Sequence, residues 1–159
     1  MAFESLLQPL REKPMFKHFL IPTDGSSLSE SAVLNAVQLA KSMSARVTAI
    51  TVSVPFHVFA LDPVMVTDTE DAYRKDCENR ATKYLGVVKS AAETAGIAFE
   101  GVHVFHEHPY AAIIAAARQK ACDVICMASH GRKGVAALVL GSETMKVLTH
   151  SKIPVLVWR

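Results

Sequence analysis

The chain has few cysteines, little net charge and no long apolar run. Among its 159 residues are three cysteines, which cannot all pair with one another, and reduced thiols in a cytoplasm are the simplest interpretation. No apolar run reaches the roughly 18 residues that span a bilayer, and the first nine residues lack the apolar stretch of a secretory signal. A net charge of +2 with mixed signs is too small to indicate a nucleic-acid surface. We therefore expect a cytoplasmic protein that binds neither nucleic acid nor membrane.

The composition fits one folded domain, and the apolar pattern alternates between strand and helix. Half of the residues are hydrophobic (50%), which argues against disorder. Strands are expected at 18–21, 46–54, 99–106, 123–127 and 153–158. Helices are expected to follow capping boxes at 27–30 and 67–70, and to cover about 109–119 and 143–150. This alternation predicts an α/β fold, a parallel sheet with helices on both faces and a ligand site beyond the carboxyl ends of the strands.

Two segments stand apart from this repeat. Residues 1–14 contain two prolines and mixed polar and apolar side chains, and we expect them to form a flexible N-terminal extension. Residues 55–66 are rich in apolar side chains and are expected to form a loop before the long second helix, which Gly96 can terminate. The domain itself is expected to cover 15–159.

Residues 128–142 carry the pattern most informative about function. A turn of small residues follows the apolar run 123–127, and Gly141 and Ser142 precede the helix expected at 143–150. Free backbone N–H groups and the positive end of a helix dipole bind anions without a charged side chain, and glycine allows close approach and a positive φ. The Ser142 hydroxyl adds a donor. The spacing matches neither the Walker pattern nor G-x-G-x-x-G, so neither of those phosphate sites is predicted.

With these elements in place, the sequence closely resembles the universal stress protein family. The resemblance covers residues 15–159 and rests on the opening segment 16–26, the loop 129–134, the pair 141–142 and the closing segment 154–157. It implies a five-stranded parallel sheet in the order 3-2-1-4-5, a Rossmann-like fold similar to that of the adenine-nucleotide α-hydrolases.

The resemblance also implies an ATP site. Nucleotide-binding members carry a glycine, two residues, a second glycine, nine residues and then glycine with Ser or Thr. The residues assigned to the site are Pro22, Thr23, Asp24 and Val52 on the adenine and ribose side, and Ala128, His130, Gly131, Gly141, Ser142 and Thr144 on the phosphate side. Mg²⁺, if present, would be held mainly by phosphate oxygens and water. No catalytic residue and no protein metal ligand is assigned.

Ala128 stands where the family pattern has its first glycine. If this position needs a positive φ, a Cβ costs on the order of 1 kcal/mol, and the methyl could also crowd the ribose or phosphates. Other assignments have plainer alternatives. Asp24 could cap the following helix, the two glycines could serve tight turns, and Ser142 could be an N-cap. Arg132 and Lys133 could be solvated surface charges.

Other chemistry-bearing residues give weaker signals. His103, His106 and His108 suggest a metal site, but no Cys, Asp or Glu is tied to them by ligand spacing, so we expect surface or strand-end histidines. Cys122 and Cys126 lack the C-x-x-C spacing of a redox or zinc pair and are expected to be packing residues.

The sequence therefore predicts an ATP-binding regulatory protein of the stress response, similar to universal stress proteins, with a protein partner that the sequence does not identify. A homodimer is expected through 153–158, because the implied strand order places this segment at a sheet edge. The alternative is a dimeric interaction module that does not bind nucleotide, with Ala128 as the mark of that loss. A slow ATPase or phosphotransferase ranks last, since no residue is seen to position a nucleophile at the γ-phosphate.

Overall fold

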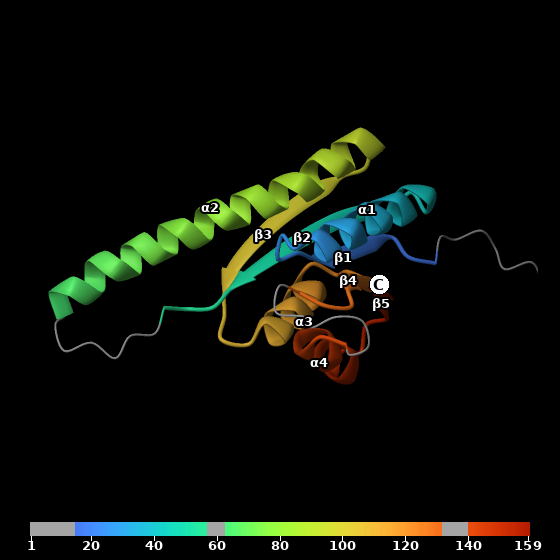
Figure 1. The fold of residues 1–159 in the computed structure, drawn as a ribbon. Coiled ribbons are helices and arrows are strands. Elements are labelled where there is room, and N and C mark those ends of the chain that lie inside the picture. The colour runs from blue at the N-terminus through green and yellow to red at the C-terminus, as the bar shows by residue number, and fades with distance from the viewer. Residues whose placement is uncertain (1–14, 57–62, 132–139) are drawn as a thin grey trace, which may run out of the picture.

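The computed structural model describes residues 15–56, 63–131 and 140–159. Strands and helices alternate along the described chain: β1 (His18–Pro22), α1 (Ser27–Ser42), β2 (Arg46–Ser53), α2 (Pro63–Ala95), β3 (Phe99–Phe105), α3 (Pro109–Gln119), β4 (Val124–Ala128), α4 (Ser142–His150) and β5 (Val155–Trp158). The strands form one parallel sheet in the order β3-β2-β1-β4-β5 (Figure 1). The predicted fold class and strand order are confirmed.

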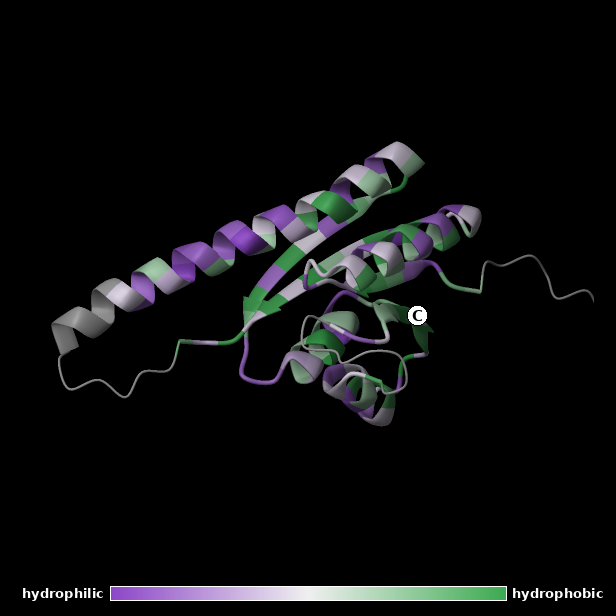
Figure 2. Ribbon diagram, in the orientation of Figure 1, coloured by the Kyte–Doolittle hydropathy of each residue, from purple (hydrophilic) through white to green (hydrophobic). Residues whose placement is uncertain are grey.

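Two apolar layers enclose the sheet, because successive side chains of each strand point to opposite faces. Phe19 and Ile21 pack with the apolar sides of α1 and α2, and Leu20 and Ile125 pack on the opposite face with α3 and α4. Helices therefore cover both faces, as predicted. Figure 2 shows that α2 carries many hydrophilic residues, whereas the central strands are mostly hydrophobic.

The first helix begins one residue earlier than its predicted capping box implies. Its N-cap is Ser26, not Ser27, and the Ser26 hydroxyl accepts a hydrogen bond from the Ser29 backbone N–H at 3.2 Å. Adjacent serines offer the same capping chemistry, and the extended backbone of Ser26 (ψ 155°) decides between them.

The second helix begins earlier than predicted and ends where predicted. It starts at Pro63, so the segment 67–70 lies inside the helix and the predicted loop 55–66 is too long. Proline suits a first helical position because its missing N–H would have no partner there. At the other end Gly96 has φ +72°, the left-handed conformation that stops the helix. In the described parts of the chain no helix is both long and apolar enough to cross a membrane.

Candidate functional site

The loops after β1 and β4 meet at the carboxyl edge of the sheet. The chain proceeds from β1 to β2 and β3 on one side and returns to β4 and β5 on the other, so ligands are expected between β1 and β4. A Cβ built on Gly131 would lie 2.5 Å from the Asp24 Oδ2 atom. A glycine at this position therefore lets the loop after β4 approach the carboxylate. Two residues assigned to the site from the sequence are brought together.

A network of buried hydroxyl groups holds the loop after β1. The Ser29 hydroxyl donates to Thr23 Oγ1 at 3.0 Å, and the Thr51 hydroxyl donates to the Thr23 carbonyl oxygen at 3.1 Å. The Thr23 N–H in turn donates to the Ile50 carbonyl at 2.9 Å. Thr23, Ser29 and Thr51 are almost fully buried. Ser29 and Thr51 are not among the site residues predicted from the sequence, although Thr51 is adjacent to the predicted Val52.

Asp24 belongs to the turn before α1 and is not the helix cap. Its Oδ1 atom accepts a hydrogen bond from the Ser26 N–H at 3.0 Å, while Ser26 itself is the N-cap. The next residue, Gly25, has φ +71°, and a Cβ there would lie 2.1 Å from the Tyr84 ring of α2. This turn therefore requires glycine both for its backbone conformation and for contact with α2.

Ala128 is the last residue of β4, which corrects the expectation of backbone strain. Among the described residues with a side chain, only Ser44 and Ala121 have positive φ, so the Ala128 methyl causes no left-handed strain. Ala128 is buried, and its carbonyl accepts a hydrogen bond from the Thr144 hydroxyl at 3.0 Å. Strand pairing with β5 keeps its backbone extended.

The start of α4 folds back on the loop after β4. Gly141, not Ser142, is the N-cap, so the N-cap alternative for Ser142 is wrong. The Gly141 N–H donates to the Ser129 carbonyl at 2.8 Å, and a Cβ on Gly141 would lie 3.3 Å from Ser129 O and from His130 Cα. The φ of Gly141 is −58°, so this glycine serves close approach and not a left-handed turn. The first turn of α4 therefore begins directly beside the loop.

His130 has one satisfied and one unsatisfied ring nitrogen. Its Nδ1 atom lies 2.9 Å from the Ser129 hydroxyl, whereas its buried Nε2 atom has no hydrogen-bond partner in the described part of the chain. A buried polar atom without a partner costs about 1–3 kcal/mol, so a polar group of a ligand would stabilise this loop. Arg132 and Lys133 lie outside the described residues.

The remaining predicted residues frame the site. Pro22 ends β1, and Val52 lies in β2 and packs against the apolar cluster on the α3 and α4 face, so its side chain also contributes to the core. Thr144 is buried in the first turn of α4.

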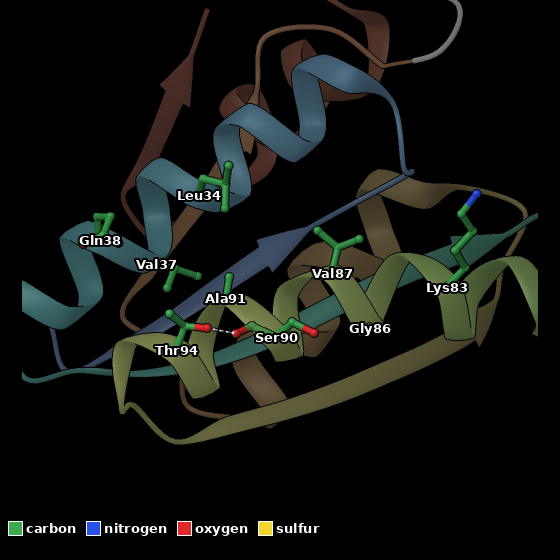
Figure 3. Close-up of a pocket in the computed structure, with 9 residues that line it drawn as sticks. All are labelled: Leu34, Val37, Gln38, Lys83, Gly86, Val87, Ser90, Ala91 and Thr94. Atoms are coloured by element: carbon green, nitrogen blue, oxygen red, sulfur yellow. Dashed lines mark hydrogen bonds between the residues drawn. The ribbon is translucent and has the colours of Figure 1, made fainter.

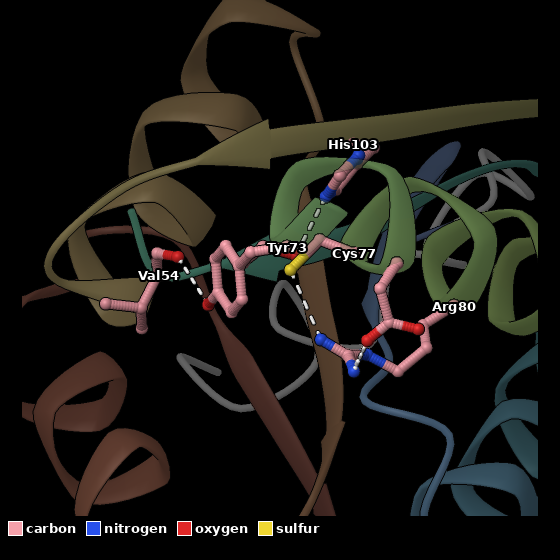
Figure 4. A network of polar contacts seen from close by, with 7 residues as sticks. Val54, Tyr73, Cys77, Arg80 and His103 are labelled. Carbon is pink, nitrogen blue, oxygen red and sulfur yellow. Dashed lines mark hydrogen bonds and ion pairs between the residues drawn. The ribbon is translucent and has the colours of Figure 1, made fainter. Parts of the chain in front are cut away.

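A second polar cluster ties α2 to the ends of β2 and β3 (Figure 4). The Tyr73 hydroxyl donates to the Val54 carbonyl at 2.8 Å, and Arg80 Nη2 donates to Cys77 Sγ at 3.2 Å. His103 Nε2 lies 2.9 Å from the Ser53 hydroxyl of β2. Burial lowers the pKa of His103. Cys77 is 1% exposed, so we interpret this cluster as an anchor for α2.

The other cysteines and histidines behave as packing and surface groups. Burial raises the pKa of Cys122 to about 11 and that of Cys126 to about 12, so both thiols stay protonated near neutral pH. The described cysteines are unpaired. β3 ends at Phe105, and His106 Nδ1 accepts a hydrogen bond from the His108 N–H at 2.9 Å. No group of three or more potential metal ligands occurs within the described ranges.

Comparisons with known proteins agree with this architecture. The model of the universal stress protein family matches residues 15–159. The universal stress protein MJ0531 of Methanocaldococcus jannaschii is 30% identical over 146 residues, covering 90% of this chain and 82% of its own. YxiE of Bacillus subtilis is also 30% identical, over 91% of this chain and 100% of its own. Among solved structures, the protein MJ0577 superimposes with a TM-score of 0.76 and 26% identity, covering 90% of this chain and 95% of its own.

Two more distant structures of this fold contain nucleotides. A universal stress protein in complex with cAMP has a TM-score of 0.63 at 21% identity, covering 91% of this chain and 97% of its own. One from Archaeoglobus fulgidus in complex with dAMP has a TM-score of 0.61 at 16% identity, covering 90% of this chain and 98% of its own. At these identities the likeness shows the fold alone.

Proposed function

Because the chain belongs to the universal stress protein family, we propose that it binds ATP at the carboxyl edge of its sheet and acts as a regulator in the stress response. The proposal depends chiefly on one observation. Gly131 approaches Asp24 so closely that an added Cβ would lie 2.5 Å from the carboxylate oxygen, so the loops after β1 and β4 meet where ligands of parallel sheets bind.

The residues around this point suit an adenine nucleotide. The glycines at 131 and 141 let the backbone approach phosphate oxygens, and the first turn of α4 offers N–H groups at Ser142 and Thr144. The unpartnered His130 Nε2 atom supplies a further polar contact, and Asp24 an acceptor for ribose or adenine. The cAMP and dAMP complexes of proteins with this fold support adenine nucleotides as the class of ligand. Mg²⁺ would be held by phosphate oxygens and water.

Some features favour the alternative of an interaction module without nucleotide. Ala128 adds a methyl where nucleotide-binding members have glycine. The Gly141 N–H and the Thr144 hydroxyl already donate to Ser129 and Ala128 carbonyls, so neither is an open donor. In this alternative Gly141 and Thr144 keep these contacts, no nucleotide binds, and the protein acts by binding a protein partner.

In either case we propose a cytoplasmic homodimer paired through β5. This strand is the edge of the sheet, and an edge with unpaired N–H and C=O groups pairs readily with a second copy across a two-fold axis. The unpaired cysteines support a reducing compartment.

Calorimetric titration with Mg-ATP separates the two functions. We expect binding in the micromolar range, where a Kd of 1 μM corresponds to about −8 kcal/mol. Gly141→Val should abolish binding, because its side chain would extend beyond a Cβ that already lies 3.3 Å from two backbone atoms of the loop. Gly86→Ala is the matched control, since a Cβ at that position would meet no atom within 4 Å.

Ala128→Gly completes the test. Relief of strain is not expected in this variant because the Ala128 backbone is that of an ordinary strand, so any tighter binding would come from removing a crowded methyl. If wild type and Ala128→Gly both show no saturation at millimolar Mg-ATP, the nucleotide function fails and the interaction module replaces it.

A further inference from the structure

The helices on the two faces of the sheet are held in different ways. On one face α1 and α2 meet through apolar side chains, and Figure 3 shows Val37 of α1 and Ala91 of α2 beside the groove between them. On the other face α4 has nine residues, of which Thr144 and Val147 are buried. A helix this short depends on tertiary contacts for its stability. Side-chain bonds from α4 to its neighbours therefore strongly influence where its first turn lies.

The start of α3 is capped by a residue of α4. His108 is the N-cap of α3, and its side chain makes no capping hydrogen bond within the described residues. Pro109 follows at the first helical position and has no N–H, so the Tyr110 N–H is the first donor of the helix. This N–H donates to Glu143 Oε2 at 2.8 Å. A glutamate 33 residues away thus supplies the cap that α3 lacks.

Both carboxylate oxygens of Glu143 are engaged. Oε2 accepts from the Tyr110 N–H, and Oε1 accepts from Lys146 Nζ at 2.9 Å. The hydrogen bond to Glu143 raises the pKa of Lys146, and the ammonium also lies 5.4 Å from the centre of the Tyr110 ring. The carboxylate is therefore held toward α3, with its charge partly neutralised.

Glu143 lies between two residues assigned to the phosphate side of the candidate site. Its neighbours Ser142 and Thr144 belong to the first turn of α4, where backbone N–H groups have no partner inside the helix. The same turn is fixed to the loop after β4, because the Gly141 N–H and the Thr144 hydroxyl donate to carbonyl groups there. The first turn of α4 is thus joined to β4 through one set of bonds and to α3 through Glu143. A hydrogen bond to a carboxylate is stronger than one between neutral groups, so the second connection is a substantial one.

We propose that Glu143 is a positioning residue of the candidate nucleotide site. Its carboxylate joins the start of α4 to the start of α3 and fixes the direction in which the first turn of α4 presents its N–H groups to phosphate. Glu143 itself does not contact the nucleotide. This role rests on the proposed function, since it concerns the binding of the same ligand.

Charge repulsion and positioning predict opposite effects of removing Glu143. A carboxylate one residue from Ser142 repels phosphate groups, so removal of its charge alone should tighten nucleotide binding. Loss of positioning should weaken binding instead. Glu143→Gln removes the charge but keeps a side-chain oxygen that can accept from the Tyr110 N–H, whereas Glu143→Ala removes both. The ratio of the two dissociation constants therefore isolates the hydrogen bond.

Calorimetry with Mg-ATP measures these constants on the full-length chain, including the extension expected at 1–14, which lies outside the described residues. The Kd of Glu143→Ala should rise about tenfold over wild type, and that of Glu143→Gln should stay within about threefold. Glu30→Ala is the matched control, because Glu30 is also a first-turn glutamate but belongs to α1. Its Kd should stay within about twofold of wild type.

Amide hydrogen exchange of the unliganded variants tests the connection between the helices without nucleotide. Glu143→Ala should speed exchange of the Tyr110 N–H and of the amides at 145–148, and Glu143→Gln should keep both slow. Wild-type exchange in Glu143→Ala would overturn the connection, and a Kd no higher than that of Glu143→Gln would overturn the role in binding. If wild type itself shows no saturation at millimolar Mg-ATP, the proposed function fails and this role fails with it.

Discussion

Replacing Gly131 by alanine should weaken nucleotide binding far more than it weakens the fold. The new Cβ would lie 2.5 Å from Asp24 Oδ2, about 1 Å inside an ordinary contact, so the carboxylate must turn away. The end of an aspartate side chain moves easily, and one stability cost is strain in the hydrogen bond from the Ser26 N–H to Asp24 Oδ1. We expect a loss of at most about 1 kcal/mol, or a Tm lower by no more than about 4 °C.

Affinity should respond more strongly because the displaced group is the proposed ligand contact. Losing hydrogen bonds to a carboxylate costs about 1.5–3 kcal/mol, which is roughly a 10- to 150-fold rise in Kd. Calorimetry with Mg-ATP measures this change, and thermal unfolding measures the stability. Gly86→Ala should keep the wild-type Kd and raise Tm slightly, because alanine is favoured over glycine inside a helix.

A double variant tests whether Gly131 acts through Asp24. If it does, Asp24→Asn should add little to the loss in affinity already caused by Gly131→Ala. Wild-type affinity in Gly131→Ala would refute the reasoning, and so would losses that add fully in the double variant.

Three further predictions concern stability and assembly. Gly25→Ala should lower Tm by about 5 °C or more, because the φ of Gly25 is +71° and the new Cβ would lie 2.1 Å from the Tyr84 ring of α2. An unchanged Tm would contradict this packing. Burial lowers the pKa of His18 and His103, so below about pH 6.5 the unfolded state binds more protons than the folded state. The free energy of unfolding should therefore fall as the pH decreases, by up to about 1.4 kcal/mol per pH unit for each histidine, until the folded pKa is passed. Urea unfolding at a series of pH values measures this fall. A flat profile between about pH 7 and 5 would disagree. Val157→Pro should give monomers in sedimentation with the fold retained, because it removes an outward N–H of β5; a persistent dimer would place the interface elsewhere.

The arrangement of strands and helices could be predicted because each element has a clear apolar period. The carboxyl-edge position of Asp24 and Gly131 followed from that alternation and the rule for parallel sheets. Helix starts were less certain, since Ser26 and Ser27 have the same capping chemistry and only their backbone conformation differs. The start of α2 was missed because the capping box at 67–70 lies inside the helix, whereas the true start, Pro63, falls within the segment predicted as a loop.

The chemistry inside the site was harder to predict because it depends on contacts between distant segments. The motif could not show that Ala128 ends a strand with an extended backbone, so the expected strain was wrong. The contact between Gly25 and Tyr84, and the hydrogen bond from Thr144 to Ala128, join elements far apart in sequence. No local pattern encodes such pairs.

The pairing of β4 with β5 also provides an optical reporter. Trp158, the single tryptophan of the sequence, lies opposite Ala128, and its carbonyl accepts a hydrogen bond from the Ser129 N–H at 2.7 Å. Its indole Nε1 atom is buried without a partner in the described chain, so its emission should be sensitive to a small change in local polarity. Selective excitation near 295 nm would thus give a fluorescence signal from one known position, between the nucleotide loop and the edge proposed for pairing. Ligand titration and dilution of the dimer could be followed on unlabelled wild-type protein.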